Sequence, residues 1–309
     1  MSAAHSALNR SAAIASISMA SVLLGLKGWG AYATGSTAML GSLADTALDL
    51  VSSIATLAGV WIAGLPDDDN HRFGHGKAEA ISALLQVVLI AVSAVGLMGH
   101  AGTELVAGTH TADAGTGVIV SAVAIVGTLG LLAWQRHVIR QTASIAISTD
   151  HLHYKADLVM NVAVIAALVL DQVAGWHWAD AVFGIAIALW LGWGAWEAST
   201  QAVDQLMDHE WPDDMKNRFL EVLARHPEIE GIHDLRTRTA GNRHFVQFHV
   251  WVDGRMSVAE AHDVMDEIEA KILAEFPDIE VLIHPDPTGH IDESGAAAED
   301  LLAGVAGRD

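Results

Sequence analysis

The chain has 309 residues, of which 52% are hydrophobic, yet its formal net charge is −21. A soluble protein does not usually combine such apolar content with such charge unless the two are segregated along the chain. They are segregated here, because residues 156–215 contain no Lys or Arg, whereas residues 209–309 hold 22 Asp and Glu against 9 Lys and Arg. An acidic tail of this kind argues against nucleic acid as a partner, since phosphate binding needs basic clusters.

The chain contains no cysteine, which removes disulfide bonds and thiolate metal sites together. Any bound metal ion must therefore be held by His and carboxylate side chains. We expect no cleavable signal peptide, because the first apolar stretch is long enough to remain as a spanning helix.

Residues 1–208 are predicted to form a helical domain in the lipid bilayer. A spanning helix needs about 20 mainly apolar residues, and six stretches meet this requirement: 12–33, 38–63, 78–106, 117–134, 143–170 and 179–202. The connections after the first, third and fifth stretches contain no Lys or Arg. Arg72 and Lys77 follow the second stretch and Arg136 and Arg140 follow the fourth, so the positive-inside rule predicts that both termini are cytoplasmic.

Residues 209–290 are predicted to form a small cytosolic domain. We expect a helix at 212–225, strands at 234–239 and 244–252, a helix at 257–276 and a strand at 279–283. The glycine-containing turn at 240–242 is typical of a hairpin, and Ser257 with Glu260 three residues later predicts a capped helix. The order αββαβ predicts a ferredoxin-like α+β domain, and the composition of residues 291–309 predicts a disordered tail.

Two of the predicted spans carry polar stripes. The second holds Ser42, Asp45, Asp49, Ser52 and Thr56, and the fifth holds Asp150, His153, Asp157 and Asn161. Spacings of three and four residues place each stripe on one helical face. Ionised groups are costly in lipid, so the two faces should point inward and towards each other. The sequence therefore predicts a four-coordinate zinc site with ligands Asp45, Asp49, His153 and Asp157.

The alternative is that these stripes only bind helices together through protonated carboxyl groups. Neither stripe contains a Lys or Arg that would neutralise three acids, and Lys155 lies off the face that holds His153 and Asp157. We therefore favour the metal site.

Two further groups of candidate ligands lie outside the predicted spans. The loop at 66–77 gathers Asp67, Asp68, Asp69, His71 and His75 around Gly74 and Gly76. A solvated acidic loop is the default interpretation, but two His at four-residue spacing favour a metal-binding loop. The cytosolic domain holds five candidates at strand edges and near a helix start: His233, His249, His262, His284 and Asp286. Single His residues are usually structural, whereas five together indicate a second metal centre.

Six spans, the paired motifs Asp45/Asp49 and His153/Asp157, and the αββαβ domain resemble the cation diffusion facilitator family. The likeness is greatest to its bacterial YiiP/FieF branch and runs from about residue 10 to residue 286. The resemblance implies a homodimeric metal/proton antiporter of the bacterial inner membrane. It implies export of zinc, with cadmium and ferrous iron as other substrates, and several zinc ions bound per protomer.

The resemblance also implies roles for individual residues. It assigns Asp45, Asp49, His153 and Asp157 to the transport site, Asp68, His71 and His75 to a loop site, and His233, His249, His262, His284 and Asp286 to a binuclear site between cytosolic domains. Leu152 occupies the position of a hydrophobic gate, and Lys77 with Asp208 matches an ion pair at the dimer interface. The chain departs from the family pattern at Pro285, where relatives can carry a polar residue.

These residue types suit proton-coupled transport. A metal ligand must be deprotonated, so a metal ion and protons compete for one site. With a reference pKa of about 6.5, His153 is expected to carry the exchanged proton, and rocking of helix bundles would alternate the exposure of the site. A membrane-anchored metal sensor or buffer is the alternative, although an anchor needs no opposed acid stripes. A metallohydrolase would need a motif such as His-Glu-x-x-His, which the chain lacks, so we expect a transporter and no enzyme.

Overall fold

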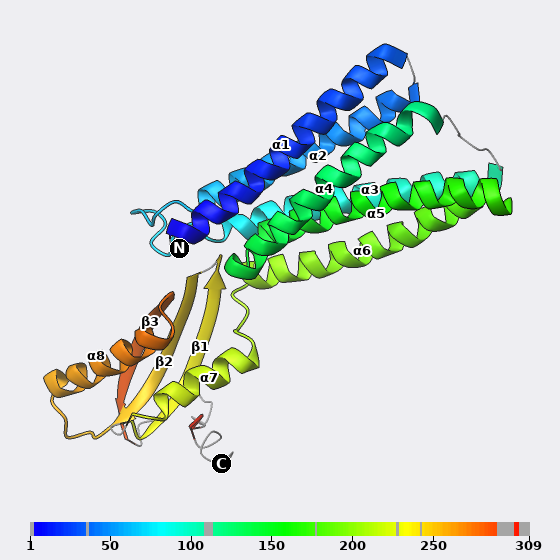
Figure 1. Ribbon diagram of the computed structural model, residues 1–309. Coiled ribbons are helices and arrows are strands. Elements are labelled where there is room, and N and C mark those ends of the chain that lie inside the picture. The colour runs from blue at the N-terminus through cyan, green and yellow to red at the C-terminus, as the bar shows by residue number, and fades with distance from the viewer. Residues whose placement is uncertain are drawn as a thin grey trace. The chain divides into compact units, whose positions relative to one another are not determined.

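A computed structural model describes residues 3–34, 37–107, 114–176, 178–226, 229–241, 243–288 and 300–302. The chain forms two compact units, one over Ser2–Asp204 and one over Gln205–Asp309 (Figure 1). The predicted disordered tail at 291–309 lies outside the described residues except at 300–302. There Asp300 Oδ1 accepts a hydrogen bond of 3.2 Å from the backbone N–H of Ile232.

Six long helices build the first unit. They are α1 (Ala3–Thr34), α2 (Thr37–Ala63), α3 (Ala78–Ala107), α4 (Ala114–Thr142), α5 (Ile145–Ala174) and α6 (Ala179–Leu206). Over the described residues, five of them, all except α4, are long and apolar enough to cross a membrane. Large apolar side chains such as Val95, Trp193 and Trp196 are exposed on these helices, as is expected where hydrocarbon replaces water. The prediction of a helical transmembrane domain is confirmed.

The fourth helix is longer than expected. The sequence predicted a span that ends at residue 134 and a basic connection after it, whereas α4 continues to Thr142 and α5 begins at Ile145. Arg136 and Arg140 therefore lie on the last turns of α4 and not in a loop. Residues 135–142 contain no Gly or Pro to end the helix, and a basic residue in the last turn interacts favourably with the helix dipole.

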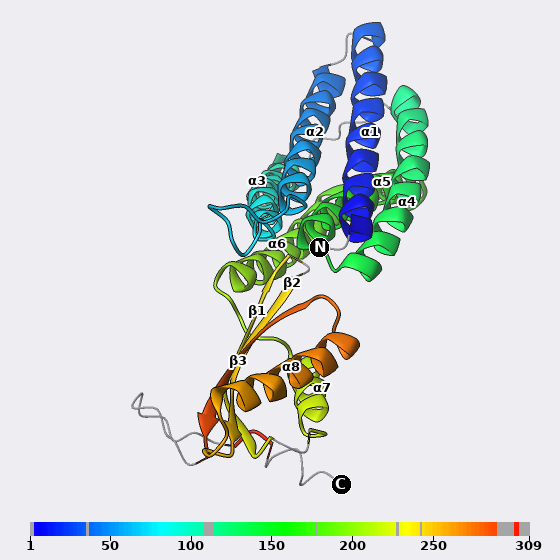
Figure 2. The ribbon, with the colours of Figure 1, turned by 90° about the vertical axis from the view of Figure 1, so that its left-hand side faces the viewer.

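The helix α5 is central to this unit, because it contacts α1, α2, α3 and α4. Figure 2 shows α1 standing between α2 and α4, both of which it contacts. The helix α6 packs on α3 and α5 through a buried apolar cluster that includes Ile90, Ala156 and Ile187. The helix that carries the second polar stripe therefore has neighbouring helices on several sides.

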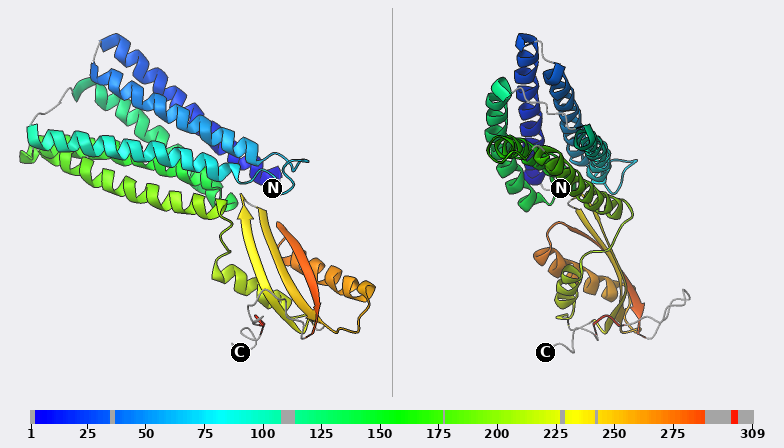
Figure 3. Two further views of the ribbon diagram at one scale, coloured as in Figure 1. Left: turned by 180° about the vertical axis from the view of Figure 1, so that it is seen from behind. Right: turned by 90° about the vertical axis from the view of Figure 1, so that its right-hand side faces the viewer.

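The second unit holds α7 (Asp213–Leu223), β1 (Gly231–Ala240), β2 (Arg243–Val252), α8 (Val258–Glu275) and β3 (Ile279–Pro287). The strands form one sheet in the order β1-β2-β3, with β1 antiparallel and β3 parallel to β2. Both helices cover the same face of the sheet (Figure 3). Phe219 of α7, Phe248 of β2 and Ile268 of α8 meet in the core between them. The predicted αββαβ order is confirmed.

Local signals explain the limits of these elements. The Ser257 side chain accepts from the backbone N–H of Glu260, and the Glu260 carboxylate accepts in return from the N–H of Ser257. This capping box satisfies donors at the start of α8. The strands β1 and β3 are longer than predicted, because the ladder with β2 continues from Gly231 on one side to Pro287 on the other.

One glycine permits the close approach of α2 and α3. A Cβ atom added at Gly59 would lie 2.6 Å from Ser82 Oγ and 3.1 Å from the Ala78 carbonyl oxygen. We predict that Gly59→Ala destabilises the transmembrane unit by about 1–3 kcal/mol, the usual cost of overpacking. Thermal unfolding of the purified protein in detergent would measure it. Gly96→Ala on α3 is the matched control, since nothing lies within 4 Å of its added Cβ; equal melting temperatures for the two variants would contradict the prediction.

Candidate metal centres

An imidazole and two carboxylates converge between α2 and α5. His153 Nε2 donates to Asp49 Oδ1 at 2.9 Å and lies 3.7 Å from Asp157 Oδ2. Ligand atoms of the three residues all lie within 4.8 Å of one another, a separation that one metal ion can bridge. Asp157 follows His153 by one helical turn, so the helix itself brings these two together, while Asp49 arrives from the facing stripe on α2.

The fourth predicted ligand lies apart from this cluster. Asp45 is on α2, one turn before Asp49, and its side chain is exposed. Ser42, at the start of the same stripe, is outside the side chains that the structure describes. The structure therefore brings together three of the four predicted ligands, and the contribution of Asp45 stays a prediction.

The geometry of the cluster sets its chemistry. A single nitrogen, His153 Nε2, faces both carboxylates, so a proton on that nitrogen occupies the place that a metal ion would take. Binding of a divalent cation to these atoms requires that proton to leave. One imidazole nitrogen with carboxylate oxygens suits zinc and similar transition metals better than calcium or magnesium.

A lysine near this cluster was missed by the sequence analysis. Lys27 on α1 donates through Nζ to Thr46 Oγ1 of α2 at 2.7 Å, beside Asp45 in the chain. Lys27 lies outside both polar stripes and is the sole Lys or Arg between residues 11 and 71. A lone lysine inside an apolar span was the available signal. In contrast, Lys155 lies off the site as expected, with Nζ 5.4 Å from the Trp190 ring centroid.

A second cluster is formed by the loop between α2 and α3. Asp68 Oδ1 accepts from the backbone N–H groups of Asn70 and His71 at 2.9 and 2.7 Å, and Oδ2 lies 3.5 Å from His75 Nε2. The hydrogen bond from the backbone N–H of His71 lowers the pKa of Asp68 more than any other contact does. The His71 and His75 rings lie 4.4 Å apart. Ligand atoms of Asp68, His71 and His75 therefore lie close enough together for one cation, and metal binding by this loop stays a prediction.

A third cluster lies across the cytosolic sheet. His233 on β1, His249 on β2 and His284 on β3 occupy the same register, so their side chains form one row. Asp286 lies two residues after His284, is 4% exposed, and contacts all three imidazoles. The contacts are His249 Nδ1 at 2.8 Å, His233 Nε2 at 3.2 Å and His284 Nε2 at 3.3 Å.

This third cluster has the features of a cation site. Among the residues that the structure describes, the buried His233 Nδ1 has no hydrogen-bond partner. His233, His249 and Asp286 place ligand atoms within 4.8 Å of one another. An unpaired buried polar atom is costly. A buried carboxylate with three imidazoles around it offers one charge and several neutral nitrogens, which is a common zinc ligand set.

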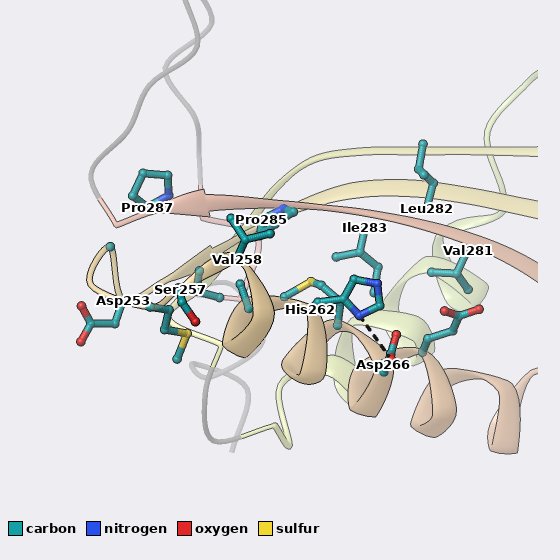
Figure 4. Close-up of a pocket in the computed structure, with 16 residues that line it drawn as sticks. Asp253, Ser257, Val258, His262, Asp266, Val281, Leu282, Ile283, Pro285 and Pro287 are labelled. Atoms are coloured by element: carbon teal, nitrogen blue, oxygen red, sulfur yellow. Dashed lines mark ion pairs between the residues drawn. The ribbon is translucent and has the colours of Figure 1, made fainter.

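The fifth predicted ligand of this cluster, His262, lies elsewhere. It is on α8, where its Nδ1 is 3.4 Å from Asp266 Oδ2. Both side chains border a groove of about 510 Å³ between α8 and β3 (Figure 4). Within one chain His262 therefore does not join the row of three His residues.

The remaining predicted residues have defined surroundings. Leu152 packs among apolar residues of α3 and α6, and a Cβ atom added at Gly194 would lie 2.9 Å from its Cδ2. Asp208 Oδ1 is 3.7 Å from Arg238 Nη1 within the second unit. Lys77 belongs to the first unit, so its pair with Asp208 stays a prediction.

Acid–imidazole clusters in an apolar helical unit and in a separate α+β domain define a membrane protein that handles metal cations. Sequence comparison agrees. The cation efflux transmembrane domain matches residues 13–207, and the cytoplasmic domain of cation efflux proteins (ZT_dimer) matches residues 211–288. The chain belongs to the cation efflux, or cation diffusion facilitator, family. It is a multi-pass membrane transporter for metal cations.

Relatives of known name support this assignment over nearly the full chain. The cation-efflux pump FieF of Escherichia fergusonii is 38% identical over 299 residues, which are 97% of this chain and 99% of that protein. FieF of Escherichia coli O127:H6 is 39% identical over 295 residues, with 96% and 98% covered.

Two solved structures resemble the cytosolic part. The metal-bound C-terminal domain of the CzcD transporter from Thermotoga maritima is 36% identical, covers 26% of this chain and 93% of that chain, and has a TM-score of 0.25. The zinc form of the transporter CzrB is also 36% identical, covers 28% and 98%, and has a TM-score of 0.26. These TM-scores are low, and the family assignment rests on the sequence matches.

We predict that His249→Ala removes most of the thermal stabilisation that zinc gives to the protein. His249 is the middle of the row and makes the shortest contact to Asp286. A site with zinc at 100 times its Kd adds about 2.7 kcal/mol. The measurement is the melting temperature with zinc and with chelator. His244→Ala on the same strand is the control, because His244 contacts Thr239 and lies outside the cluster. A zinc-induced shift equal to that of wild type would contradict the prediction.

Proposed function

We propose that the chain is a proton-coupled antiporter that exports zinc from the cytoplasm, with cadmium and ferrous iron as further substrates. The observation that carries the proposal is the position of His153 Nε2, 2.9 Å from Asp49 and 3.7 Å from Asp157. The same atoms suit a proton when the site is empty and a metal ion when it is loaded. Exchange of one for the other at a single site couples the two flows.

Transport then proceeds by alternating exposure of this site. Facing the cytoplasm, Asp49, His153, Asp157 and Asp45 capture the cation and release protons. Facing outside, protons return to His153 and the carboxylates and displace the cation. Rocking of packed helices is the usual route for such a change, with Leu152 as the apolar gate beside the site.

The proposed location is the bacterial inner membrane, with both termini in the cytoplasm. Arg72 and Lys77 lie in the connection between α2 and α3, and Arg136 and Arg140 lie near the C-terminal end of α4. If successive helices alternate in direction across the membrane, both places are on the same side. By the positive-inside rule this side faces the cytoplasm. The named relatives are bacterial pumps, which agrees with this location.

The proposed working unit is a homodimer with zinc in its cytosolic domains. His262 lies apart from the row of His233, His249 and His284 in one chain, so a partner chain would supply it to complete a binuclear site. Lys77 and Asp208 would form an ion pair at the same interface. Zinc bound there would stabilise the dimer by linkage. A membrane-anchored sensor or buffer would need only the cytosolic metal site. The contact between Asp49 and His153 inside the helical unit therefore favours a transporter.

We predict that Asp157→Ala lowers zinc flux by about 100-fold or more while the protein still folds, because a carboxylate of the transport site is lost. Flux into proteoliposomes under an imposed pH gradient is the measurement. Asp180→Ala, at an exposed carboxylate in the first turn of α6, is the control and should transport like wild type. Substantial zinc flux in Asp157→Ala would refute the assigned transport site.

We predict that His153→Asp shifts transport preference from zinc and cadmium towards manganese, because an all-oxygen site is harder than one with imidazole. The variant also replaces an imidazole by a carboxyl group, whose reference pKa is lower, so its pH profile should move in the acidic direction. Competitive flux of zinc against manganese from about pH 5.5 to 8 tests both effects. An unchanged zinc preference and pH profile would mean that His153 is not a ligand.

A further inference from the structure

A second carboxylate on the polar stripe of α5 does not take part in the metal cluster. Asp150 is one helical turn before His153 and is fully buried. Its oxygens accept from three other helices: from Ser16 Oγ of α1 at 2.6 Å, from Gln135 Nε2 of α4 at 2.8 Å and from Thr56 Oγ1 of α2 at 3.3 Å. Among the described residues, none of its contacts is an ion pair. An ionised carboxylate buried among neutral groups is costly, which marks Asp150 as a functional candidate.

The two hydroxyl donors each have a second acceptor. Ser16 Oγ lies 3.2 Å from the Ala12 carbonyl oxygen, and Thr56 Oγ1 lies 3.1 Å from the Ser52 carbonyl oxygen, each on its own helix. A hydroxyl group has one proton to donate and lone pairs that accept. When Asp150 is ionised, both hydroxyl protons point to its carboxylate. When Asp150 is protonated, one hydroxyl rotates to its own helix and accepts from the new O–H group. The site therefore satisfies Asp150 in both protonation states.

Another buried carboxylate provides a contrast. Glu79 of α3 is 2% exposed and accepts from Asn9 Nδ2 at 3.2 Å and from Ser144 Oγ at 2.5 Å. The Ser144 hydroxyl in turn accepts from the backbone N–H of Ile147 at 3.4 Å, and the structure gives its proton no alternative acceptor among the described contacts. Among the described contacts the Ser144 hydroxyl proton beside Glu79 therefore has one acceptor, whereas each hydroxyl proton beside Asp150 has two.

We propose that Asp150 binds a proton when the transport site is empty and releases it when the site binds a metal ion. This inference rests on the proposed antiport function. Asp150 precedes His153 by three residues, a rise of about 4.5 Å along the helix. A divalent cation at that distance in a poorly solvated interior favours the ionised carboxylate. By linkage, a proton on Asp150 weakens metal binding in equal measure. On metal binding the O–H bond of Asp150 breaks and the proton passes to solvent.

The other titratable groups near Asp150 come from the helices that contact α5. The charged groups that act on Asp150 are His153 on α5 itself and Asp49 on α2. Tyr154 Oη donates to the Ser16 carbonyl oxygen and contacts Ser53 Oγ, and His151 Nδ1 contacts Gln135 Oε1. The helix α6 faces α5 with apolar residues. Asp150 is thus a buried carboxylate that lies about one helical turn before His153 on α5.

The test is the number of protons released when zinc binds to the full-length protein in detergent. Calorimetry in buffers of different ionisation enthalpy gives this number. We expect Asp150→Asn, which keeps the shape and one acceptor oxygen, to release about one proton fewer per protomer at saturation with zinc than wild type. Glu79→Gln is the matched control and should release the wild-type number. The wild-type number in Asp150→Asn would overturn the inference. No proton release in wild type would overturn both this inference and the proposed antiport.

A measurement on folded wild-type protein covers the case in which Asp150→Asn does not fold. Infrared difference spectra should show the carbonyl stretch of a protonated carboxylic acid that disappears when zinc is added. In Thr56→Val that band should move in frequency, because one hydroxyl partner of Asp150 is gone. Absence of a zinc-sensitive band, or a band at the same frequency in Thr56→Val, would overturn the inference.

Discussion

The contact between His153 on α5 and Asp49 on α2 is the interaction on which the proposed transport function depends. It joins two helices whose polar faces would each be unstable in lipid alone. The nitrogen that makes this contact also faces Asp157, so one atom decides whether a proton or a metal ion occupies the site. The surrounding helices hold this geometry, because α5 contacts α1, α2, α3 and α4.

The three acid–imidazole clusters use different backbones for the same chemistry. In the membrane unit, helical spacing on α5 places His153 and Asp157 on one face. In the loop, backbone N–H groups fix Asp68 between two His residues. In the cytosolic unit, strand register aligns His233, His249 and His284, and Asp286 contacts them all. Each arrangement brings carboxylate oxygens close to imidazole nitrogens, and these ligand types together suit a borderline cation.

Hydrogen bonding gives the buried carboxylates of the membrane unit different chemical roles. Glu79 is satisfied by donors at the starts of α1 and α5 and serves to hold those helix ends. Asp150 shares its donors with backbone carbonyl groups, so its surroundings tolerate a change of protonation. Burial alone does not separate these cases. The difference lies in whether a donor has a second place for its proton.

The sequence by itself determined the spans, the polar stripes, the αββαβ order and the capping box at Ser257, because periodicity and local hydrogen bonding are properties of neighbouring residues. It also supplied most candidate ligands. Tertiary structure alone decided which of them meet. A helical period fixes the face of a residue but not its partner, so Asp45 and Asp150 share stripes with the cluster and yet lie outside it. Strand register, which no single strand encodes, aligned three His residues. His262 lies on α8 beside Asp266 and outside this row. Only the packing of α1 against α2 shows that Lys27 donates to Thr46, the neighbour of Asp45.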